Sequence, residues 1–558
     1  MRSVPLCPWF LSLRGNAQAG RFHCFGNIHF RTCAGSKVKT RIQLPRGRGS
    51  PPMPVRRFRA GRRSIRKCGA LRIGTLRYFQ EQVELPETVS QTGPEGGAMI
   101  GRALIAEFEK LLGRDNVFAD EADRHTYSYD AAVLDPVLPA LVVRPTSSEG
   151  LGRSVRLCGE NALPVTVRGA GTNLSGGTIP ARGGVVIVTN GLNRILEINE
   201  ADLYAVVEPG VVTARFAAAV ESRGLFYPPD PGSQAVSTLG GNVAENAGGL
   251  RGLKYGVTGD YVLGLSFFDA NGEIVKTGAR TVKCVAGYNL AGLMVGSEGT
   301  LGVFDRIILK LIPIPAARKA MLAVFDDIAK ACEAVSGIIA DKIVPATLEL
   351  MDNFTIRAVE DYGHAGLPVD AAALLLIEVD GHAAQVEEDA SRVEAVCRGR
   401  GAMSLRVART AAERDKVWEA RRAALSALAK LKPTVVLEDA TVPRSKIPAM
   451  MNSLEAIASR YRLTIGTFGH AGDGNLHPTI LTDRRDRAEW SRVEAAIDAI
   501  FDEALKLGGT LSGEHGIGLA KSRFLEKETS RATILYSRRI KTALDPKNIL
   551  NPGKIIGE

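Results

Sequence analysis

Long apolar runs and paired cysteines are both missing from this sequence. No stretch reaches the roughly 18 uninterrupted apolar residues that a membrane-spanning helix needs, so any membrane role would be peripheral. The eight cysteines are scattered singly, without CxxC spacing. Neither an iron–sulfur cluster nor a disulfide framework is indicated, which suits a reducing compartment. With 558 residues, 45% of them hydrophobic, the chain can bury enough apolar surface for two domains.

Acidic residues are absent from the first 80 positions, which contain 18 Lys and Arg. This segment accounts for the formal charge of +11, because the chain from Met99 onward has 53 basic and 56 acidic residues. The body of the protein is therefore near neutral, and no nucleic-acid partner is expected. The basic segment is rich in Pro and Gly and lacks sustained periodicity, so it is not expected to form a packed core.

Three interpretations of residues 1–98 compete. An Arg-rich, acid-poor composition is typical of a mitochondrial transit peptide, although about a hundred residues is long for one. A disordered basic arm that binds anions or membranes is the second. The third, which we favour, is a mis-extended start, because helical periodicity begins near Met99. We expect a cytoplasmic protein, with peripheral association at the inner membrane as an alternative, or a mitochondrial one if the leader is a transit peptide.

Helical periodicity first appears after Met99. Apolar residues between Ile100 and Leu112 share one helical face that ends at Gly113, so residues 99–135 are expected to be an N-terminal helical segment. Short strands and helices then alternate. Strands are expected at 140–143, 165–169, 185–189 and 204–208, helices after a capping box at 146–149 and after a cap at Thr213, and a hairpin turn at Asn271-Gly272.

Pro313 and Pro315 mark the end of a first mixed α+β domain, 136–315. Beyond them longer helices separate short strands, such as helix 383–400 after strand 374–379, with a helical part around 410–460. This pattern predicts a second α+β domain over 316–556. The fold class is therefore α+β with two domains.

One of the expected strands is followed by a glycine-dense loop, RGAGTNLSGG over 168–177. Glycine lets backbone N–H groups turn toward a pyrophosphate, and Thr172, Asn173 and Ser175 add donors for the same oxygens. The spacing is not GxGxxG and no GK[ST] follows, so the loop is neither a dinucleotide fingerprint nor a Walker loop. Taken alone, an ordinary turn is a competing interpretation.

This loop resembles the phosphate loop of the vanillyl-alcohol-oxidase flavoprotein superfamily, whose PCMH-type domain holds FAD between two α+β subdomains. Two more stretches match in family order, PPDPGS to LGGNVAENAGG over 228–249 and GSEGTLGV over 296–303. Their small residues would let the backbone approach a flat ring and offer amides to it. Many relatives attach FAD covalently through a histidine near the phosphate loop. This loop has none, so non-covalent FAD is expected.

The chain ends in DPKNILNPGK over 545–554, which resembles the family's D-P-x-x-x-L-N-P-G-K ending. The resemblance implies that Asn551 reaches back to the flavin, although a plain C-terminal turn is the alternative. The FAD-binding residues implied by all four motifs are Arg168, Gly169, Gly171, Thr172, Asn173, Ser175, Gly176, Pro229, Asp230, Gly240, Gly241, Asn246, Gly249, Glu298, Gly302, Val303 and Asn551.

Two histidine motifs lie in the second domain, HAGDGNLH over 470–477 and SGEHG over 512–516. Two histidines at a glycine-rich strand end with a later carboxylate form a reasonable three-ligand divalent site with open positions for substrate. A structural histidine pair is the alternative, although three of the eight histidines fall in these motifs. In D-lactate and D-2-hydroxyglutarate dehydrogenases the matching residues bind a zinc-like metal. The resemblance implies His470, His477 and Glu514 as ligands of Zn or Mn, and His515 as the base.

The segment WEAR, from Trp418 to Arg421, resembles the family's W-x-x-R, whose arginine holds the substrate carboxylate in a bidentate fork. An exposed helical arginine is the alternative, because Arg422 is adjacent and could be mistaken for it.

Two leucines bear on the substrate. The 2-hydroxyglutarate branch has Thr and Lys at the places of Leu425 and Leu437. The loss of both polar groups argues against a dicarboxylate, so glycolate or lactate is expected unless Lys430 or Lys432 reaches the site.

Over residues 136–556 the chain thus resembles the FAD-dependent 2-hydroxy acid dehydrogenases of the glycolate oxidase subunit and D-lactate dehydrogenase type, with a ferredoxin-like C-terminal domain that carries the substrate and metal sites. The resemblance implies that Arg421 anchors the carboxylate, the metal polarises the hydroxyl, His515 removes its proton and the Cα hydride passes to flavin N5. The electrons must then reach an acceptor other than O2, such as a quinone, a cytochrome or an iron–sulfur partner subunit.

Four other interpretations compete, and the sequence argues against the last two of them. One is a D-2-hydroxyglutarate dehydrogenase. Another is a metal-dependent hydrolase in which His515 activates water and the glycine loops bind a phosphorylated substrate. A third is a flavin-fold ether-lipid synthase, which needs a run of consecutive histidines that this chain lacks. The last, a binding-only scaffold, would need a damaged site, whereas every expected catalytic residue type is present.

Overall fold

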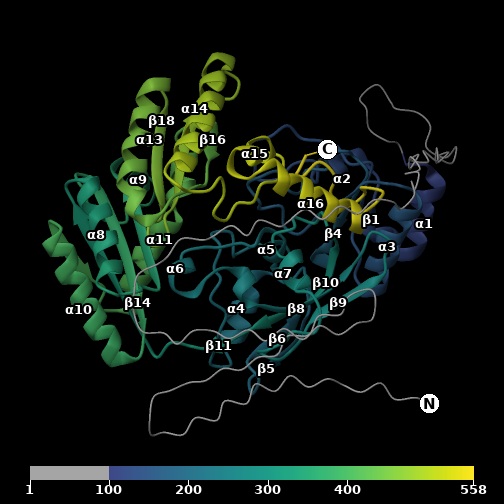
Figure 1. The fold of residues 1–558 in the computed structure, drawn as a ribbon, viewed down its shortest axis with the longest axis horizontal. Helices are drawn as coiled ribbons and strands as arrows, with labels where there is room; N and C mark the ends of the chain where they lie inside the picture. Colours follow the sequence, from purple (N-terminus) through teal and green to yellow (C-terminus); the bar gives the residue numbers. More distant parts are fainter. Residues whose placement is uncertain (1–99, 558) are drawn as a thin grey trace, which may run out of the picture. The chain divides into compact units, whose positions relative to one another are not determined.

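The structure, a computed structural model, describes residues 100–557, and Figure 1 shows its elements in chain order. The interpretations of residues 1–98 lie outside the described residues. Helix α1 (Arg102–Leu112) confirms the first predicted helix and ends at Gly113. Gly113 has a φ of 82°, which glycine adopts without strain, and its N–H donates to the carbonyl of Glu109.

The first sheet has four strands in the order β1-β2-β4-β3, of which only the edge strand β1 runs antiparallel. Phe108 of α1 and Leu151 of α3 share a core with this sheet. The strands expected at 140–143, 165–169 and 185–189 are confirmed to within one residue. The elements here are β1 (Val117–Phe118), α2 (Glu121–His125), β2 (Leu141–Val143), α3 (Ser148–Glu160), β3 (Val165–Arg168) and β4 (Val185–Val188).

The start of helix α3 corrects the predicted capping box. Ser147 is the N-cap, and its hydroxyl accepts a hydrogen bond from the N–H of Gly150 at 3.1 Å. The predicted pair of Thr146 and Glu149 is wrong by one position, because the adjacent serine offers the same capping chemistry one residue closer to the helix.

The second sheet is antiparallel, with five strands in the order β5-β6-β10-β8-β9. Strands β8 and β9 form the hairpin predicted at Asn271-Gly272. Thr213 was expected to cap a helix, but it is the first helical residue, and its hydroxyl donates to the carbonyl of Ser237 at 3.0 Å. The elements here are β5 (Ile195–Asn199), β6 (Tyr204–Val207), α4 (Thr213–Glu221), β7 (Leu225–Phe226), α5 (Leu239–Glu245), α6 (Gly252–Tyr255), β8 (Val262–Phe268), β9 (Ile274–Gly278), α7 (Leu290–Met294), β10 (Val303–Lys310) and β11 (Ile312–Pro313).

The third sheet has eight strands, and its first four take the order β15-β12-β14-β13, which is the ferredoxin-like arrangement. Alternate residues of each strand point to opposite faces, so the sheet builds two separate apolar cores. The strands are β12 (Ala317–Phe325), β13 (Thr347–Asp352), β14 (Ala373–Gly381), β15 (Ser404–Val407), β16 (Thr434–Leu437), β17 (Ala440–Thr441), β18 (Thr464–His470) and β19 (Asn475–Thr482).

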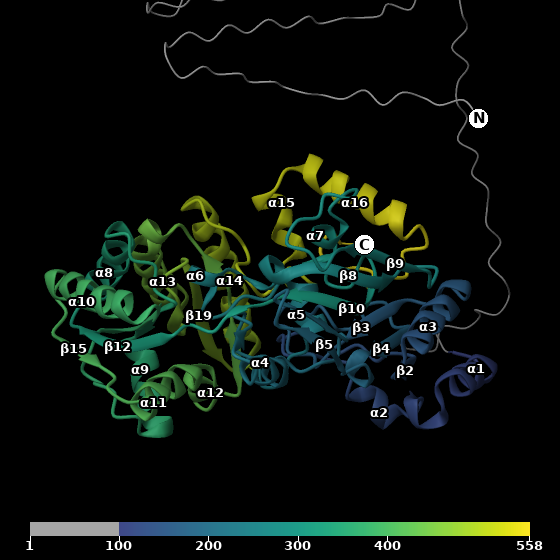
Figure 2. The same cartoon turned by 90° about the horizontal axis from the view of Figure 1, so that it is seen from below.

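Helices cover both faces of this sheet, as Figure 2 shows. The first face is covered by α8 (Ile328–Ala340), α10 (Ala383–Gly399), α13 (Ile447–Tyr461) and α14 (Arg487–Lys506). The second face is covered by α9 (Asn353–Gly363), α11 (Ala411–Arg422) and α12 (Ala424–Ala429). The strand and helix expected at 374–379 and 383–400 are confirmed, whereas the helical part expected at 410–460 is interrupted by β16 and β17.

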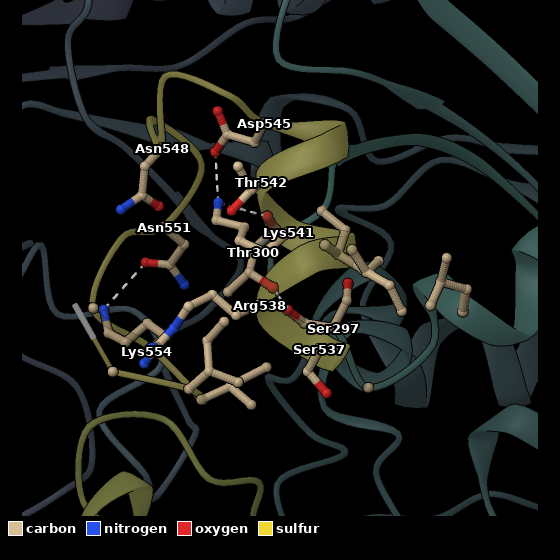
Figure 3. A pocket seen from close by; sticks show the side chains of 18 of the residues that line it. Ser297, Thr300, Ser537, Arg538, Lys541, Thr542, Asp545, Asn548, Asn551 and Lys554 are labelled. Atoms are coloured by element: carbon tan, nitrogen blue, oxygen red, sulfur yellow. Dashed lines mark hydrogen bonds and ion pairs between the residues drawn. The ribbon is translucent and has the colours of Figure 1, made fainter. Parts of the chain in front are cut away.

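The C-terminal segment returns to the first sheet. After α15 (Leu525–Glu528) and α16 (Arg531–Leu544), Leu550 forms a parallel bridge with Val165 of β3. The side-chain amide of Asn551 donates to the carbonyls of Gly177 at 2.8 Å and Glu298 at 2.6 Å. Asn551 also lines a cavity of about 300 Å³ that α16 helps to form, as Figure 3 shows. Within residues 100–557, no helix has the length and apolar character to cross a membrane.

Candidate active site

A cavity of about 540 Å³ brings the glycine-rich segments of the first domain together with the histidine motifs of the second. One wall consists of the loop after β3, the segment around α5 and the turn before β10. The other wall consists of side chains from α11, α12, β16, β18, β19 and the 512–516 segment. Motifs that are hundreds of residues apart in sequence thus share one cavity.

The phosphate loop is fixed in place by close contacts on both sides. A Cβ at Gly169 would lie 2.3 Å from Oγ1 of Thr238, which itself caps α5, so only glycine fits there. On the other side, the Asp130 carboxylate accepts hydrogen bonds from Nδ2 of Asn173 at 2.7 Å and from the N–H of Thr178 at 3.2 Å. The sequence reasoning missed Asp130. The loop is therefore preorganised, as a pyrophosphate cradle requires.

Fourteen of the predicted site residues line this cavity, and small residues dominate the wall where the flavin is expected. They are Gly169, Gly171, Thr172, Asn173, Asp230, Gly240, Gly241, Glu298, Gly302, Arg421, His470, His477, Glu514 and His515. A wall of glycine, serine and threonine has room for a flat ring and offers backbone and hydroxyl donors. The residues present therefore fit FAD.

Eight other predicted FAD-binding residues lie outside the lining of this cavity, and their role toward FAD stays a prediction. Arg168 donates to the carbonyl of Tyr129 at 2.6 Å, and Asn246 ends α5 in a left-handed conformation. Arg168 and Asn246 thus fix the backbone next to the cavity without lining it. The eight are Arg168, Ser175, Gly176, Pro229, Asn246, Gly249, Val303 and Asn551.

The three predicted metal ligands converge. His470 ends β18, and His477 lies on the adjacent strand β19. Oε1 of Glu514 lies 3.2 Å from Nε2 of His470 and 3.4 Å from Nε2 of His477. One ligand atom from each of the three residues lies within 4.8 Å of the others. Two imidazoles and one carboxylate on a cavity wall fit a divalent ion of the zinc type.

His515 lies directly beside this cluster. Its ring stacks on that of His477 at 5.2 Å between centroids. Burial lowers the pKa of His515 to about 4, against an opposing effect of the Asp439 carboxylate. The imidazole is therefore neutral at neutral pH and able to accept a proton.

Asp439 is a fully buried carboxylate that contacts the 512–516 segment. Its Oδ2 accepts hydrogen bonds from the N–H groups of Glu514 and His515, both at 3.0 Å, and from Oγ of Ser512 at 2.7 Å. Its Oδ1 accepts one from Nδ2 of Asn475 at 2.5 Å. Asp439, His477 and His515 could also enclose an ion. Both Asp439 oxygens already accept hydrogen bonds, so the set with Glu514 suits an ion better.

Glu298 of the first domain contacts the residues that directly follow the 512–516 segment. Glu298 accepts hydrogen bonds from the N–H groups of Ile517 and Gly518, both at 2.8 Å. Burial raises the pKa of Glu298 to about 7, against the opposing effect of these bonds. Glu298 therefore faces the cavity while it holds the segment that follows His515.

Arg421 is buried on α11 and faces the cavity, so the alternative of an exposed helical arginine does not apply to it. Trp418, three residues earlier on the same helical face, donates from Nε1 to Oε2 of Glu378 at 2.9 Å. The guanidinium of Arg421 lies over the Phe468 ring at 4.7 Å. The neighbouring Arg422 lines the same cavity.

Leu425 and Leu437 both line the cavity, as their predicted role in substrate selection requires. Lys430 and Lys432 do not line it, and Lys430 lies over the ring of Tyr362. Leu425 and Leu437 therefore add apolar surface to the cavity, whereas the neighbouring Arg422 adds a charged side chain.

Glu349 was also missed. It lies on β13, is fully buried and contacts both Arg421 and His470. Burial raises its pKa, but the charges of His470 and Arg421 outweigh burial and hold the pKa below its usual value. Burial lowers the pKa of His470, yet the carboxylates of Glu349 and Glu514 hold it well above the ordinary value. A carboxylate between two apolar residues, Leu348 and Leu350, is a sequence signal that marks Glu349 as buried, although it does not assign Glu349 to the site.

Comparisons with known proteins agree with this architecture. A family profile described as "FAD binding domain" matches residues 139–278, and one described as "FAD linked oxidases, C-terminal domain" matches residues 314–555. Among solved structures, p-cresol methylhydroxylase has a TM-score of 0.70 at 19% identity, over 82% of this chain and 96% of its own. An alkyldihydroxyacetonephosphate synthase has a TM-score of 0.66 at 20% identity, over 84% and 87%. These likenesses confirm the PCMH-type FAD-binding fold.

Curated relatives indicate the class of FAD-binding enzyme to which the chain belongs. The glycolate oxidase subunit GlcD of Bacillus subtilis is 49% identical to this chain, over 82% of the chain and 98% of the relative. The D-lactate dehydrogenase of Anaerostipes hadrus is 34% identical, over 81% and 97%. The chain belongs to the FAD-linked oxidoreductase family that includes these two proteins. It is an FAD-dependent hydroxy acid oxidoreductase, which excludes the hydrolase and the binding-only scaffold.

Proposed function

We propose that this protein oxidises a small 2-hydroxy monocarboxylate, glycolate or D-lactate, to the 2-oxo acid and passes the electrons to an acceptor other than O2. The observation that carries the proposal is the shared cavity. Arg421, His515 and the three-ligand cluster face the same space as the phosphate loop. The names of the relatives, glycolate oxidase subunit and D-lactate dehydrogenase, support the substrate class.

Arg421, His515 and the three-ligand cluster have distinct tasks in this reaction. The free edge of the Arg421 guanidinium binds the substrate carboxylate. The neutral imidazole of His515 accepts the hydroxyl proton. His470, His477 and Glu514 would hold a divalent ion, Zn or Mn, which would make the substrate hydroxyl more acidic. FAD, when bound, supplies the two-electron acceptor for the hydrogen on the substrate carbon.

The apolar wall favours a monocarboxylate. Leu425 and Leu437 offer no hydrogen bond to a second carboxylate, and burying an unpaired carboxylate is costly. D-2-Hydroxyglutarate is therefore the less favoured substrate.

Two further parts of the proposal concern the cofactor and the acceptor. We expect FAD to be bound non-covalently, because the 168–177 loop has no histidine. Trichloroacetic acid should then release all the flavin into the supernatant, and yellow pelleted protein would contradict this. The acceptor is expected to be a quinone, a cytochrome or an iron–sulfur partner subunit, because the sequence contains no cluster or haem motif of its own.

The decisive experiment is anaerobic bleaching of the flavin in the purified holoenzyme. Glycolate, D-lactate, L-lactate and D-2-hydroxyglutarate would be compared, followed by turnover with a dye acceptor and with O2. We expect rapid bleaching by glycolate or D-lactate and faster turnover with the dye than with O2. Bleaching by D-2-hydroxyglutarate alone, or by none of the four acids, would overturn the proposal.

A further inference from the structure

We infer that Glu349 is a positioning residue that fixes the substrate-binding arginine and a metal-binding histidine relative to each other. Oε1 of Glu349 lies 2.7 Å from Nδ1 of His470. Oε2 lies 2.7 Å from Nε and 2.6 Å from Nη2 of Arg421. One buried carboxylate therefore joins the two groups that would hold opposite parts of the substrate. The inference rests on the proposed function of this site.

The strand register determines which face Glu349 occupies. Strand β13 pairs with β18 so that Leu350 is opposite Gly469 and Met351 is opposite Phe468. Extending this antiparallel register by one residue places Glu349 opposite His470. Leu348 and Leu350 point into the core of the other face, which leaves Glu349 on the face that α11 covers.

The contact with Glu349 determines how His470 presents its ring. A carboxylate 2.7 Å from Nδ1 accepts the hydrogen of that nitrogen. The neutral, ion-binding form of the ring then has its lone pair on Nε2, the atom that lies near Glu514. Such a carboxylate behind a ligating histidine orients the ring and strengthens metal binding.

The contact with Arg421 leaves one edge of the guanidinium free. Glu349 accepts a hydrogen bond from Nε and forms an ion pair with Nη2 through the same oxygen. The Phe468 ring lies against the guanidinium face. Three N–H groups, two on Nη1 and one on Nη2, are left to form the fork that binds a carboxylate. Glu349 thus sets the angle of this fork with respect to the His470 ring.

The test variant is Glu349→Gln in the FAD-loaded protein. A glutamine can accept from Arg421 through its oxygen, but its NH2 group then faces Nδ1 of His470. The ring would be driven to the other tautomer, with its hydrogen on Nε2. We expect Zn²⁺ affinity, measured by competition with a chelator, to fall roughly 10- to 100-fold. We also expect KM for the 2-hydroxy acid to rise, while flavin content stays unchanged.

The matched control is Glu378→Gln. Glu378 is also a buried carboxylate of this sheet, but its partner is Nε1 of Trp418, from which a glutamine oxygen can accept equally well. We expect this variant to keep the wild-type Zn²⁺ affinity and KM. Glu349→Asp, which keeps the charge but shortens the side chain, is the second test and should show both defects.

The outcomes separate this inference from the proposed function. If the wild type oxidises no 2-hydroxy acid but Glu349→Gln still binds Zn²⁺ more weakly than Glu378→Gln, the proposed function fails and the positioning role stands. If the wild type is active and both Glu349 variants match the control in Zn²⁺ affinity and KM, the positioning role is overturned. It is also overturned if neither Glu349 variant retains FAD, because Glu349 would then be a structural ion-pair partner.

Discussion

Two neighbouring histidines, His470 and His515, differ in chemistry because their partners differ. His470 lies between two carboxylates, Glu349 and Glu514, which hold its pKa well above the usual value in the absence of an ion. His515 has no carboxylate at hydrogen-bonding distance among the described contacts of its ring, and burial lowers its pKa to about 4. One ring is therefore arranged to bind a cation and the other to accept a proton.

The role of His515 as the base can be tested by His515→Asn. Asparagine cannot accept the hydroxyl proton at neutral pH, so turnover should fall roughly 100-fold or more. FAD and metal content should not change. The measurement is stopped-flow bleaching of the flavin by glycolate and D-lactate without O2. Bleaching as fast as in the wild type would show that another group takes the proton.

His470→Ala separates a metal site from a structural histidine pair. Removing one of three ligands should abolish binding of the ion together with turnover. Metal analysis and activity per folded molecule are the measurements. A structural pair would instead lower the melting temperature and spare the rate per folded molecule.

Leu437→Lys should shift substrate preference. A lysine at this position of the cavity wall would offer a charged partner to a second carboxylate. A hydrogen bond to a charged group contributes about 1.5 to 3 kcal/mol, so kcat/KM for D-2-hydroxyglutarate relative to D-lactate should rise on the order of tenfold. Leu437→Met is the control for the change in shape. An unchanged ratio would mean that the second carboxylate does not reach this wall.

At the scale of secondary-structure elements, the site depends on hydrogen bonds that fix segments without regular secondary structure. The 512–516 segment has no regular secondary structure, yet it carries both Glu514 and His515. Asp439 compensates for this by accepting hydrogen bonds from the backbone of both residues. A single buried carboxylate thus fixes the backbone of this turn, whereas the hydrogen bonds between β18 and β19 fix the backbone of His470 and His477.

Asp439→Asn should therefore disorganise the segment. The NH2 group of asparagine would face at least one N–H or O–H donor, and a buried unmet donor costs roughly 1–3 kcal/mol. We expect faster amide hydrogen exchange over 512–516, weaker Zn²⁺ binding and lower turnover, with FAD retained. Unchanged exchange over this segment would contradict the role of Asp439.

The sequence predicted the elements better than the contacts between them. Strands such as 185–189 and the Asn271-Gly272 hairpin were predictable because their signals are local. The N-cap of α3 was predicted at Thr146 instead of Ser147, because both adjacent residues have a hydroxyl that can cap a helix. Glu349 and Asp130 could not be assigned to the site, because their partners lie far along the chain, 121 residues away for His470 and 43 for Asn173. Burial and register, which create these contacts, are properties of the folded sheet.

At the scale of the whole molecule, the first domain is completed by the last residues of the chain. Leu550 pairs with Val165 of β3. Asn551 bridges the phosphate loop and the turn that carries Glu298. Lys554 is buried and donates to the carbonyl of Ile179 at 2.5 Å.

Removing residues 545–558 should therefore abolish FAD binding, although this segment lines none of the cavity itself. The loss of the β3 bridge and of both Asn551 hydrogen bonds would free the phosphate loop from the turn opposite it. The measurement is flavin absorbance per protein after gel filtration. The paired control deletes residues 1–98, which precede every site residue, and should keep FAD and turnover. A C-terminal deletion that still binds FAD would show that Asn551 is not needed to close the cradle.

This closure by the chain end also has a consequence for biosynthesis. Gly177 and Asn551 are 374 residues apart, so a ribosome that adds 5 to 20 residues per second synthesises Asn551 roughly 20 to 75 s after the loop that it supports. Throughout that interval the nascent first domain lacks its final parallel pairing. Flavin is therefore expected to bind after release from the ribosome rather than during translation. A stop codon anywhere upstream of Leu550 would give a chain that does not bind flavin.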